Sequence, residues 1–246
     1  MKQIFDSLKK QSPSRIIALG FSAVILVGAV LLMMPFSLKK GVHLSFLNAL
    51  FTSTSAVCVT GLVVVDTADS FTAIGQAIVA ALIQIGGLGI ASVGVGLIIA
   101  AGKRVSIKSR LMVKEALNVD TYHGMVRLVR IVLAITLGFE AAGAIISFFV
   151  FRKDYSPLHA VGISIFHSIA AFNNAGFDNL GGMHNLIPYK DNILLNITTD
   201  VLVIVGGIGF LVLVDIVKQK SFKKLCLHSK VAISMTAVLL IGGTLI

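Results

Sequence analysis

Two short glycine-containing stretches of this sequence have residue types suited to coordinating a dehydrated cation. They are Val59-Thr60-Gly61-Leu62 and Asn174-Ala175-Gly176-Phe177, and an offset of 115 residues relates Gly61 to Gly176. Backbone carbonyl oxygens can replace the hydration shell of a cation where several short loops face one axis. Glycine gives such a loop the dihedral angles that turn carbonyls inward. The pattern predicts two walls of an ion-selective filter, and interfacial helices capped by glycine are the alternative.

Each stretch ends a short apolar segment, Leu44–Val59 in the first copy and Pro157–Asn174 in the second. About 13 helical residues reach roughly 20 Å, which is short of the ~30 Å hydrocarbon core of a membrane. Backbone that enters a membrane without crossing it is tolerated only where protein buries it or where it lines a water-filled path. We therefore expect two re-entrant hairpins, each of which begins and ends outside the cell.

The composition is that of an all-α integral membrane protein. Of the 246 residues, 56% are hydrophobic and only 13% are charged. The net charge of +10 could indicate a nucleic-acid partner. However, the basic residues form clusters between apolar segments, which is how membrane topology is encoded, so no nucleic acid is expected.

Five apolar segments are long enough to span a membrane: Ile16–Phe36, Phe71–Ala101, Leu128–Phe151, Ile193–Val217 and Lys230–Ile246. Most of the 21 Lys and Arg residues lie before the first, after the second and after the fourth. The positive-inside rule places these regions in the cytoplasm. The predicted division is a cytoplasmic N-terminus (1–15), a span–pore-loop–span unit (16–102), a cytoplasmic linker (103–127), a second unit (128–217), a cytoplasmic linker (218–229) and the truncated start of a third unit (230–246).

Two further patterns concern packing rather than the filter itself. Gly86-Gly87-Leu88-Gly89 and Gly206-Gly207-Ile208-Gly209 repeat at an offset of 120 residues, and we interpret them as close helix packing in preference to ion contact. Ser106–Asn118 alternates apolar and basic residues. It is predicted to be an amphipathic helix on the inner membrane surface, with a solvated linker helix as the alternative.

Two acids fall within apolar segments, where an ionised carboxylate costs about 3 kcal/mol on insertion scales. As hypotheses, Asp200 attracts cations near the outer mouth, and Glu140 pairs with a group outside this chain. The alternative for both is a hydrogen bond to a neighbouring helix. We interpret His167 as a packed polar residue and Cys58 as a small packing group.

These motifs resemble the Trk/Ktr/HKT superfamily of potassium transporters, and within it the membrane subunit of bacterial Ktr systems. The resemblance rests on Thr54–Leu62, Phe172–Phe177 and the glycine-rich segments that follow them. It implies four units around one axis, each giving one filter glycine, so that Gly61 and Gly176 match the first two and the chain resembles an N-terminal half. It also implies K+ uptake that Na+ can stimulate, a homodimer, and a cytosolic nucleotide-binding regulatory subunit of RCK/KTN type.

The resulting expectation is a multi-pass protein of the bacterial inner membrane, with a cytoplasmic N-terminus, that passes K+ through a filter of re-entrant loops. The alternative is an alternating-access carrier for a cation or a small solute. An enzyme is not expected, because the sequence contains neither G-x-S-x-G nor H-E-x-x-H. Nor is a bound cofactor expected: K+, with Na+ as a second candidate, is cargo held only at the filter residues.

Overall fold

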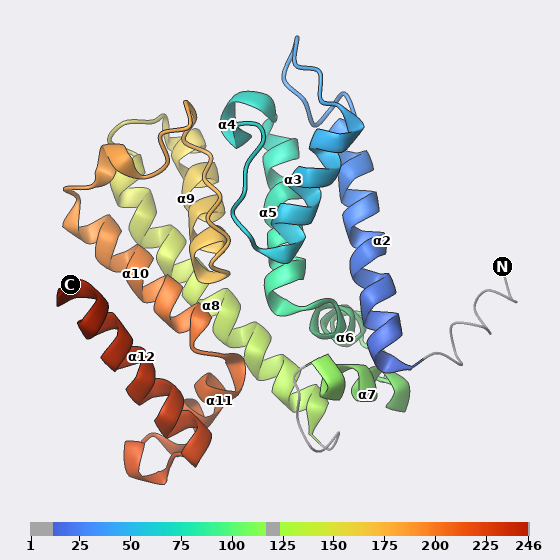
Figure 1. Ribbon diagram of the computed structural model, residues 1–246, viewed down its shortest axis with the longest axis vertical. Coiled ribbons are helices and arrows are strands. Elements are labelled where there is room, and N and C mark those ends of the chain that lie inside the picture. The colour runs from blue at the N-terminus through green and yellow to red at the C-terminus, as the bar shows by residue number, and fades with distance from the viewer. Residues whose placement is uncertain (1–11, 117–123, 246) are drawn as a thin grey trace, which may run out of the picture.

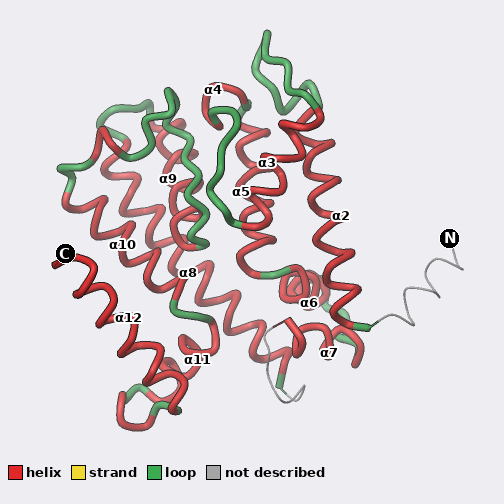
Figure 2. Tube along the Cα trace, in the orientation of Figure 1, coloured by secondary structure: helices red, strands yellow, loops and turns green. Residues whose placement is uncertain are grey.

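The computed structural model describes residues 12–116 and 124–245, and helices joined by loops make up this part of the chain (Figures 1 and 2). The α-helices are α2 (Pro13–Met33), α3 (Phe46–Cys58), α4 (Thr67–Ser70), α5 (Ala73–Leu88), α6 (Ile90–Ala100), α7 (Ile107–Ala116), α8 (Met125–Phe151), α9 (Pro157–Phe172), α10 (Ile193–Gly207), α11 (Phe210–Gln219) and α12 (Leu227–Leu245). Short 3-10 turns cover Ile187–Tyr189 and Phe222–Lys224.

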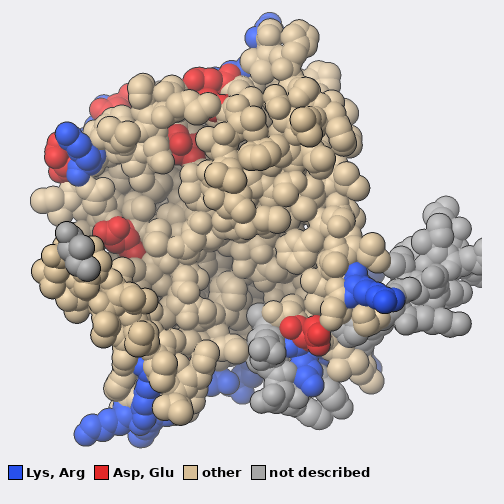
Figure 3. All heavy atoms as spheres, viewed as in Figure 1, with Lys and Arg blue, Asp and Glu red and all other residues tan. Residues whose placement is uncertain are grey.

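Three of the described helices, α2, α8 and α12, are long and apolar enough to cross a membrane. Two bent pairs, α5 with α6 and α10 with α11, bring the number of candidate spans to five if each pair is one span. On the face that Figure 3 shows, most Lys and Arg side chains lie toward the two ends of the molecule, and the surface between is largely uncharged. The fold is therefore the all-α membrane fold that the sequence predicts.

The short helices α3 and α9 form re-entrant hairpins. In Figure 1 both begin near the upper end of the molecule and end near its middle, and the chain then returns to the upper end. α3 packs against α2 and α5, and α9 packs against α8 and α10. Each hairpin thus packs between the two helices that flank it in its own unit, in keeping with the burial that re-entrant backbone requires.

One pair of hydrogen bonds shows how closely the two units repeat. Ser53 Oγ donates to the carbonyl of Ile25 over 2.8 Å, and Ser168 Oγ donates to the carbonyl of Glu140 over 2.7 Å. In each unit a serine of the short helix, two residues after a phenylalanine, bonds the helix that precedes it. In both units the two bonded residues are 28 positions apart in the sequence. The short helix therefore meets the preceding helix at equivalent positions in the two units.

The second and fourth apolar segments are each divided into two helices by a sharp bend. α5 and α6 meet at 105° and α10 and α11 at 97°. The breaks fall at Gly89, with φ 78°, and at Gly209, with φ 97°, and glycine adopts such angles without a Cβ penalty. Hydropathy does not mark these breaks because both arms of each bent pair are apolar.

The predicted amphipathic helix is present as α7, while Asn118 lies outside the described residues. Val113 of α7 is fully buried in a cluster with Val95 and Val129. Ser14 Oγ donates to Glu115 Oε1 over 2.8 Å and joins the start of α2 to α7. The helix is therefore packed against the protein, and its contact with the membrane surface stays a prediction.

Candidate functional site

The two short helices end in the same backbone conformation. Val59, the C-cap of α3, has φ 56°, and Asn174, one residue beyond the C-cap of α9, also has φ 56°. Left-handed backbone is a genuine outlier for a β-branched residue such as valine, and such strain clusters at functional sites. The surrounding contacts, not local preference, must hold Val59 in place.

Matched hydrogen bonds close both turns. The Thr60 N–H donates to the carbonyl of Ser55 over 3.0 Å, and the Ala175 N–H donates to that of Ala170 over 2.8 Å. The glycines that follow have φ 71° and φ 69° respectively. Two sequences that share little besides their glycine therefore fold into the same hairpin tip.

The two tips meet at their glycines. A Cβ added to Gly61 would lie 2.9 Å from the carbonyl oxygen of Ala175 and 3.3 Å from the Cα of Gly176. Thr60, Leu62, Asn174 and Gly176 are exposed, whereas Ala175 and Phe177 are buried. The structure thus brings both sequence-predicted stretches together and leaves part of each open on one side.

The glycine clusters of α5 and α10 lie directly behind the hairpin tips. A Cβ on Gly86 would overlap the carbonyl oxygen of Val57, and a Cβ on Gly206 would overlap that of Phe172. Val57 and Phe172 are equivalent in the two repeats. The interpretation of these clusters as close helix packing is confirmed for this first glycine of each, and the last glycine of each forms the break described above.

The two intramembrane acids differ in their surroundings. Glu140 is 6% exposed, and its Oε1 accepts a hydrogen bond from Asn173 Nδ2 over 3.2 Å. The hypothesis that Glu140 pairs with a group outside this chain is therefore wrong: its partner follows α9. Asp200 is exposed on α10, and its attraction of cations stays a prediction.

His167 and Cys58 also have definite environments. His167 is buried, with its Nε2 3.0 Å from Thr199 Oγ1, which confirms a packed polar residue. Cys58 is exposed, so its interpretation as a packing group is wrong; the last turn of α3 buries Ala56 and Val57 instead. Cys226 is also free and exposed.

Acids at the outer end of the hairpins tie the two units together. Asp66 Oδ2 accepts from the Met183 N–H over 2.7 Å, and Asp69 Oδ2 accepts from the Gly182 N–H over 3.0 Å. Asp178, in the connection between α9 and α10, is half-buried. Its burial raises the pKa of the carboxyl, the nearby charge of Asp66 raises it further, and the hydrogen bond from the Leu180 N–H opposes the rise.

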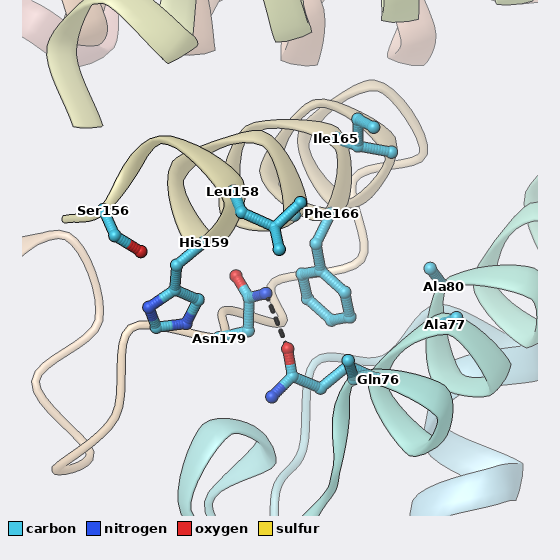
Figure 4. A pocket seen from close by; sticks show the side chains of 11 residues that line it. Gln76, Ala77, Ala80, Ser156, Leu158, His159, Ile165, Phe166 and Asn179 are labelled. Atoms are coloured by element: carbon cyan, nitrogen blue, oxygen red, sulfur yellow. Dashed lines mark hydrogen bonds between the residues drawn. The ribbon is translucent and has the colours of Figure 1, made fainter. Parts of the chain in front are cut away.

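A pocket of about 480 Å³ lies between the N-terminal part of α5 and that of α9 (Figure 4). Its lining includes Leu158, Ile165 and Phe166 but none of the eight residues that the sequence predicts to form the filter. At its edge Asn179 Nδ2 donates to Gln76 Oε1 over 3.0 Å. Sequence reasoning missed this contact. The signal that could have indicated it is a pair of polar residues, Gln76 and Gln84, in the otherwise apolar sequence of α5.

Among the residues that the structure describes, no three His, Cys, Asp or Glu side chains lie close enough together to hold a metal ion. The facing tips instead offer backbone carbonyls and neutral side-chain oxygens. Such oxygens can replace the hydration shell of a monovalent cation, and this mode of binding needs no acidic ligands.

Repeated spans, re-entrant hairpins and facing glycine tips define a multi-pass helical membrane protein of the transport class. Residues 8–241 match the family model of the TrkH cation transport proteins, and the chain belongs to this family. It is a family of transporters, not of enzymes.

Curated relatives agree with this assignment. The chain is 41% identical over 235 residues, 96% of its length, to the potassium/sodium uptake protein NtpJ of Enterococcus hirae. It is 41% identical over 228 residues, 93% of its length, to the Ktr system potassium uptake protein B of Bacillus subtilis, and 37% identical over 243 residues, 98% of its length, to that of Vibrio alginolyticus. It covers 52%, 50% and 52% of these three proteins, so the chain spans about half the length of the curated relatives it matches.

Proposed function

We propose that this chain contributes two of the filter walls of a potassium uptake system, whose remaining walls come from sequence beyond it. The observation that carries the proposal is the contact between Gly61 and Gly176 at the tips of two hairpins with the same backbone conformation. Carbonyls of Val59–Leu62 and Asn174–Phe177 would replace the hydration shell of the ion. Translocation is channel-like, and the membrane potential drives it with about 2.3 kcal/mol per charge per 100 mV.

K+ is the proposed cargo, and Na+ the ion that stimulates its uptake. The printed names of the relatives support this choice: two are potassium uptake proteins and one is a potassium/sodium uptake protein. Each ion is held by the filter oxygens alone, as a transported substrate. Asp200 and Asp178 would raise the local cation concentration on the outer side.

The hairpins enter from outside, with their helix C-termini toward the membrane centre. The partly negative C-terminal end of a helix favours a cation there. This orientation places 1–15, 103–127 and 218–229 in the cytoplasm of a bacterial inner membrane and makes 16–102 and 128–217 the two units, with 230–246 opening a third. It is supported by the basic residues of these regions.

The orientation can be tested with cysteines in a variant that lacks Cys58 and Cys226. Gly41→Cys, before α3, and His184→Cys, after α9, should react with a membrane-impermeant thiol reagent added to intact cells. Ser106→Cys should react only after the cells are opened. Labelling of Ser106→Cys in intact cells would contradict the proposed orientation.

The assembly proposed is a homodimer with one pore in each subunit, docked on a cytosolic nucleotide-binding regulatory subunit of RCK/KTN type. Two relatives are named as parts of a Ktr system, which supports partners of this kind. Lys220, Lys223 and Lys224 lie in the loop between α11 and α12 and give that loop a basic surface suited to an acidic partner or to anionic lipid.

A carrier with alternating access is the second candidate. The breaks at Gly89 and Gly209 favour it, since discontinuous helices line the sites of many carriers. The parallel entry of both hairpins opposes it, because many carriers have inverted repeats. A carrier would show saturable flux coupled to that of a second solute. Channel-like currents without such coupling would exclude the carrier.

The proposed function is tested by growth of an uptake-deficient bacterium at limiting K+. The full-length protein that carries this chain should restore growth, and the 246-residue chain alone should not, because two walls cannot close a four-sided filter. Failure of the full-length protein, present in the membrane at normal abundance, would contradict potassium uptake.

A further inference from the structure

Two glutamines of the first unit bond the second hairpin on both sides of its filter stretch. Gln84 Oε1 accepts from Asn173 Nδ2 over 3.1 Å, and Gln76 Oε1 accepts from Asn179 Nδ2 over 3.0 Å. Asn173 immediately precedes the stretch Asn174–Phe177, and Asn179 lies two residues after it. Because both glutamines belong to α5, one rigid helix holds both ends of the stretch.

Both asparagines are buried, at 9% and 3% exposure. The Asn173 amide also donates to Glu140 Oε1 over 3.2 Å and to the carbonyl of Ile169 over 2.9 Å. The two hydrogens of this amide are shared among three acceptors, so loss of the Gln84 oxygen would release the amide from α5 while its bonds to α8 and α9 remain. Asn173 is therefore fixed from three helices: α5, α8 and its own α9.

Steric contact reinforces the bond at Asn173. A Cβ added to Gly87 of α5 would overlap the Asn173 Oδ1. The absence of a side chain at Gly87 is thus what lets α5 approach closely enough for Gln84 to reach the amide. At Gly94, on α6, an added Cβ meets nothing within 4 Å, so that position offers a matched control.

The first hairpin has no counterpart of these two anchors. At the offset of 115 residues, Cys58 stands where Asn173 stands in the second hairpin, and Val64 stands where Asn179 does. Both Cys58 and Val64 are exposed. The amide anchors therefore belong to the junction between the units and are not part of the repeated hairpin.

We propose that Gln84 and Gln76, acting through Asn173 and Asn179, are positioning residues that set the ion selectivity of the second filter stretch. The proposal rests on the proposed function, in which Asn174–Phe177 contributes filter oxygens. Discrimination between K+ and Na+ depends on the number and placement of those oxygens. A stretch held at both ends keeps its oxygens apart when the smaller ion would draw them inward.

The test uses the full-length protein with Gln84→Leu or Gln76→Leu, each of which removes the acceptor and approximately keeps the volume. Uptake of K+ and of Na+ is measured for each, with membrane abundance and thermal unfolding as companion measurements. We expect the K+/Na+ selectivity ratio to fall about tenfold at normal abundance, the order of effect of one buried hydrogen bond. Asn196→Leu is the control: it removes a side-chain amide that bonds the carbonyl of Lys190, away from the filter, and should leave the ratio unchanged.

A pair of substitutions that exchanges the donor at Asn173 and the acceptor at Glu140 tests whether this contact positions the filter stretch or only stabilises the fold. Asn173→Asp should lower the selectivity ratio, since it places two carboxyl groups together, and Glu140→Gln in the same protein should restore it by supplying a donor. Gly87→Ala should lower the ratio, and Gly94→Ala should not.

Two results would overturn the inference. If the wild-type protein takes up K+ and both glutamine variants keep its selectivity at normal abundance, the inference fails and the proposed function stands. If the wild-type protein takes up no K+, the proposed function is wrong, and so is the inference that rests on it.

Discussion

Gly61 and Gly176 face each other across the boundary between the two units. A Cβ added to either glycine would lie 3.3 Å from the Cα of the other. Both have positive φ, 71° and 69°, and each follows a helix that ends within the body of the molecule. An added Cβ would crowd the opposite tip, most of all at Gly61, where it would lie 2.9 Å from the carbonyl oxygen of Ala175. The closeness of the two hairpin tips is therefore itself a reason for glycine there.

The first prediction is that Gly61→Ser lowers K+/Na+ selectivity in the full-length protein. The serine Cβ would lie 2.9 Å from the carbonyl oxygen of Ala175, and left-handed backbone costs an ordinary residue about 1–2 kcal/mol. The control is Gly41→Ser, since Gly41 also has positive φ, 84°, but an added Cβ there meets nothing within 4 Å. Flux ratios that change equally in both variants would show that contact between the tips is irrelevant to selectivity.

The second prediction concerns the serine bonds that repeat in the two units. Ser53→Ala and Ser168→Ala should each lower the free energy of unfolding by about 1 kcal/mol, because each leaves a helix carbonyl without its side-chain donor. Thermal unfolding in detergent measures the effect. Ser22→Ala removes a bond within α2 alone and should cost less. Equal losses in all three variants would argue against a special role for the bonds between pore helix and span.

The third prediction is that Gly206→Ala destabilises the second unit by more than about 1 kcal/mol, since its Cβ would overlap the carbonyl oxygen of Phe172. Gly138→Ala on α8, where nothing lies within 4 Å, should be neutral or slightly stabilising because alanine favours a helix. Membrane abundance and unfolding temperature report the difference. Tolerance of Gly206→Ala would mean that α10 and the hairpin are not in contact.

The fourth prediction follows from Asp178, which lies outside the spanning helices. Burial, helped by the charge of Asp66, raises the pKa of its carboxyl, so it loses its charge at a higher pH than an ordinary aspartate does as the solution is acidified. A raised carboxyl pKa also means that the folded protein gains stability as pH falls through it. We expect the K+ concentration for half-maximal uptake to rise with that protonation, and Asp178→Asn to remove this part of the pH dependence. An unchanged pH profile in the variant would separate Asp178 from ion attraction.

The hairpins were predictable from the sequence because a single length argument decides them. The segment that became α3 has 13 residues, too few to cross, and its repeat at α9 carries the same glycine. The breaks at Gly89 and Gly209 were not predicted, since the residues on both sides of each are mainly apolar. The glycines were recognised, but their role as bends depends on what packs against each arm.

The anchors of the second hairpin were beyond sequence reasoning for a different reason. Asn173 and Gln84 are 89 residues apart and belong to different units, and no local pattern pairs them. The sequence marks Glu140 as an acid whose burial in an apolar segment is unfavourable, and a hydrogen bond from Asn173 stabilises its carboxyl group. Only the packing of α5 against α9 could show this.

The most direct test of the account is the position of a bound ion. Crystals of the full-length protein soaked in Tl+, a heavy substitute for K+, should show anomalous density beside the backbone oxygens of Thr60, Gly61, Ala175 and Gly176, and excess K+ should displace it. Anomalous density confined to another part of the protein, with none between the two glycine tips, would contradict the assignment of these hairpins as filter walls.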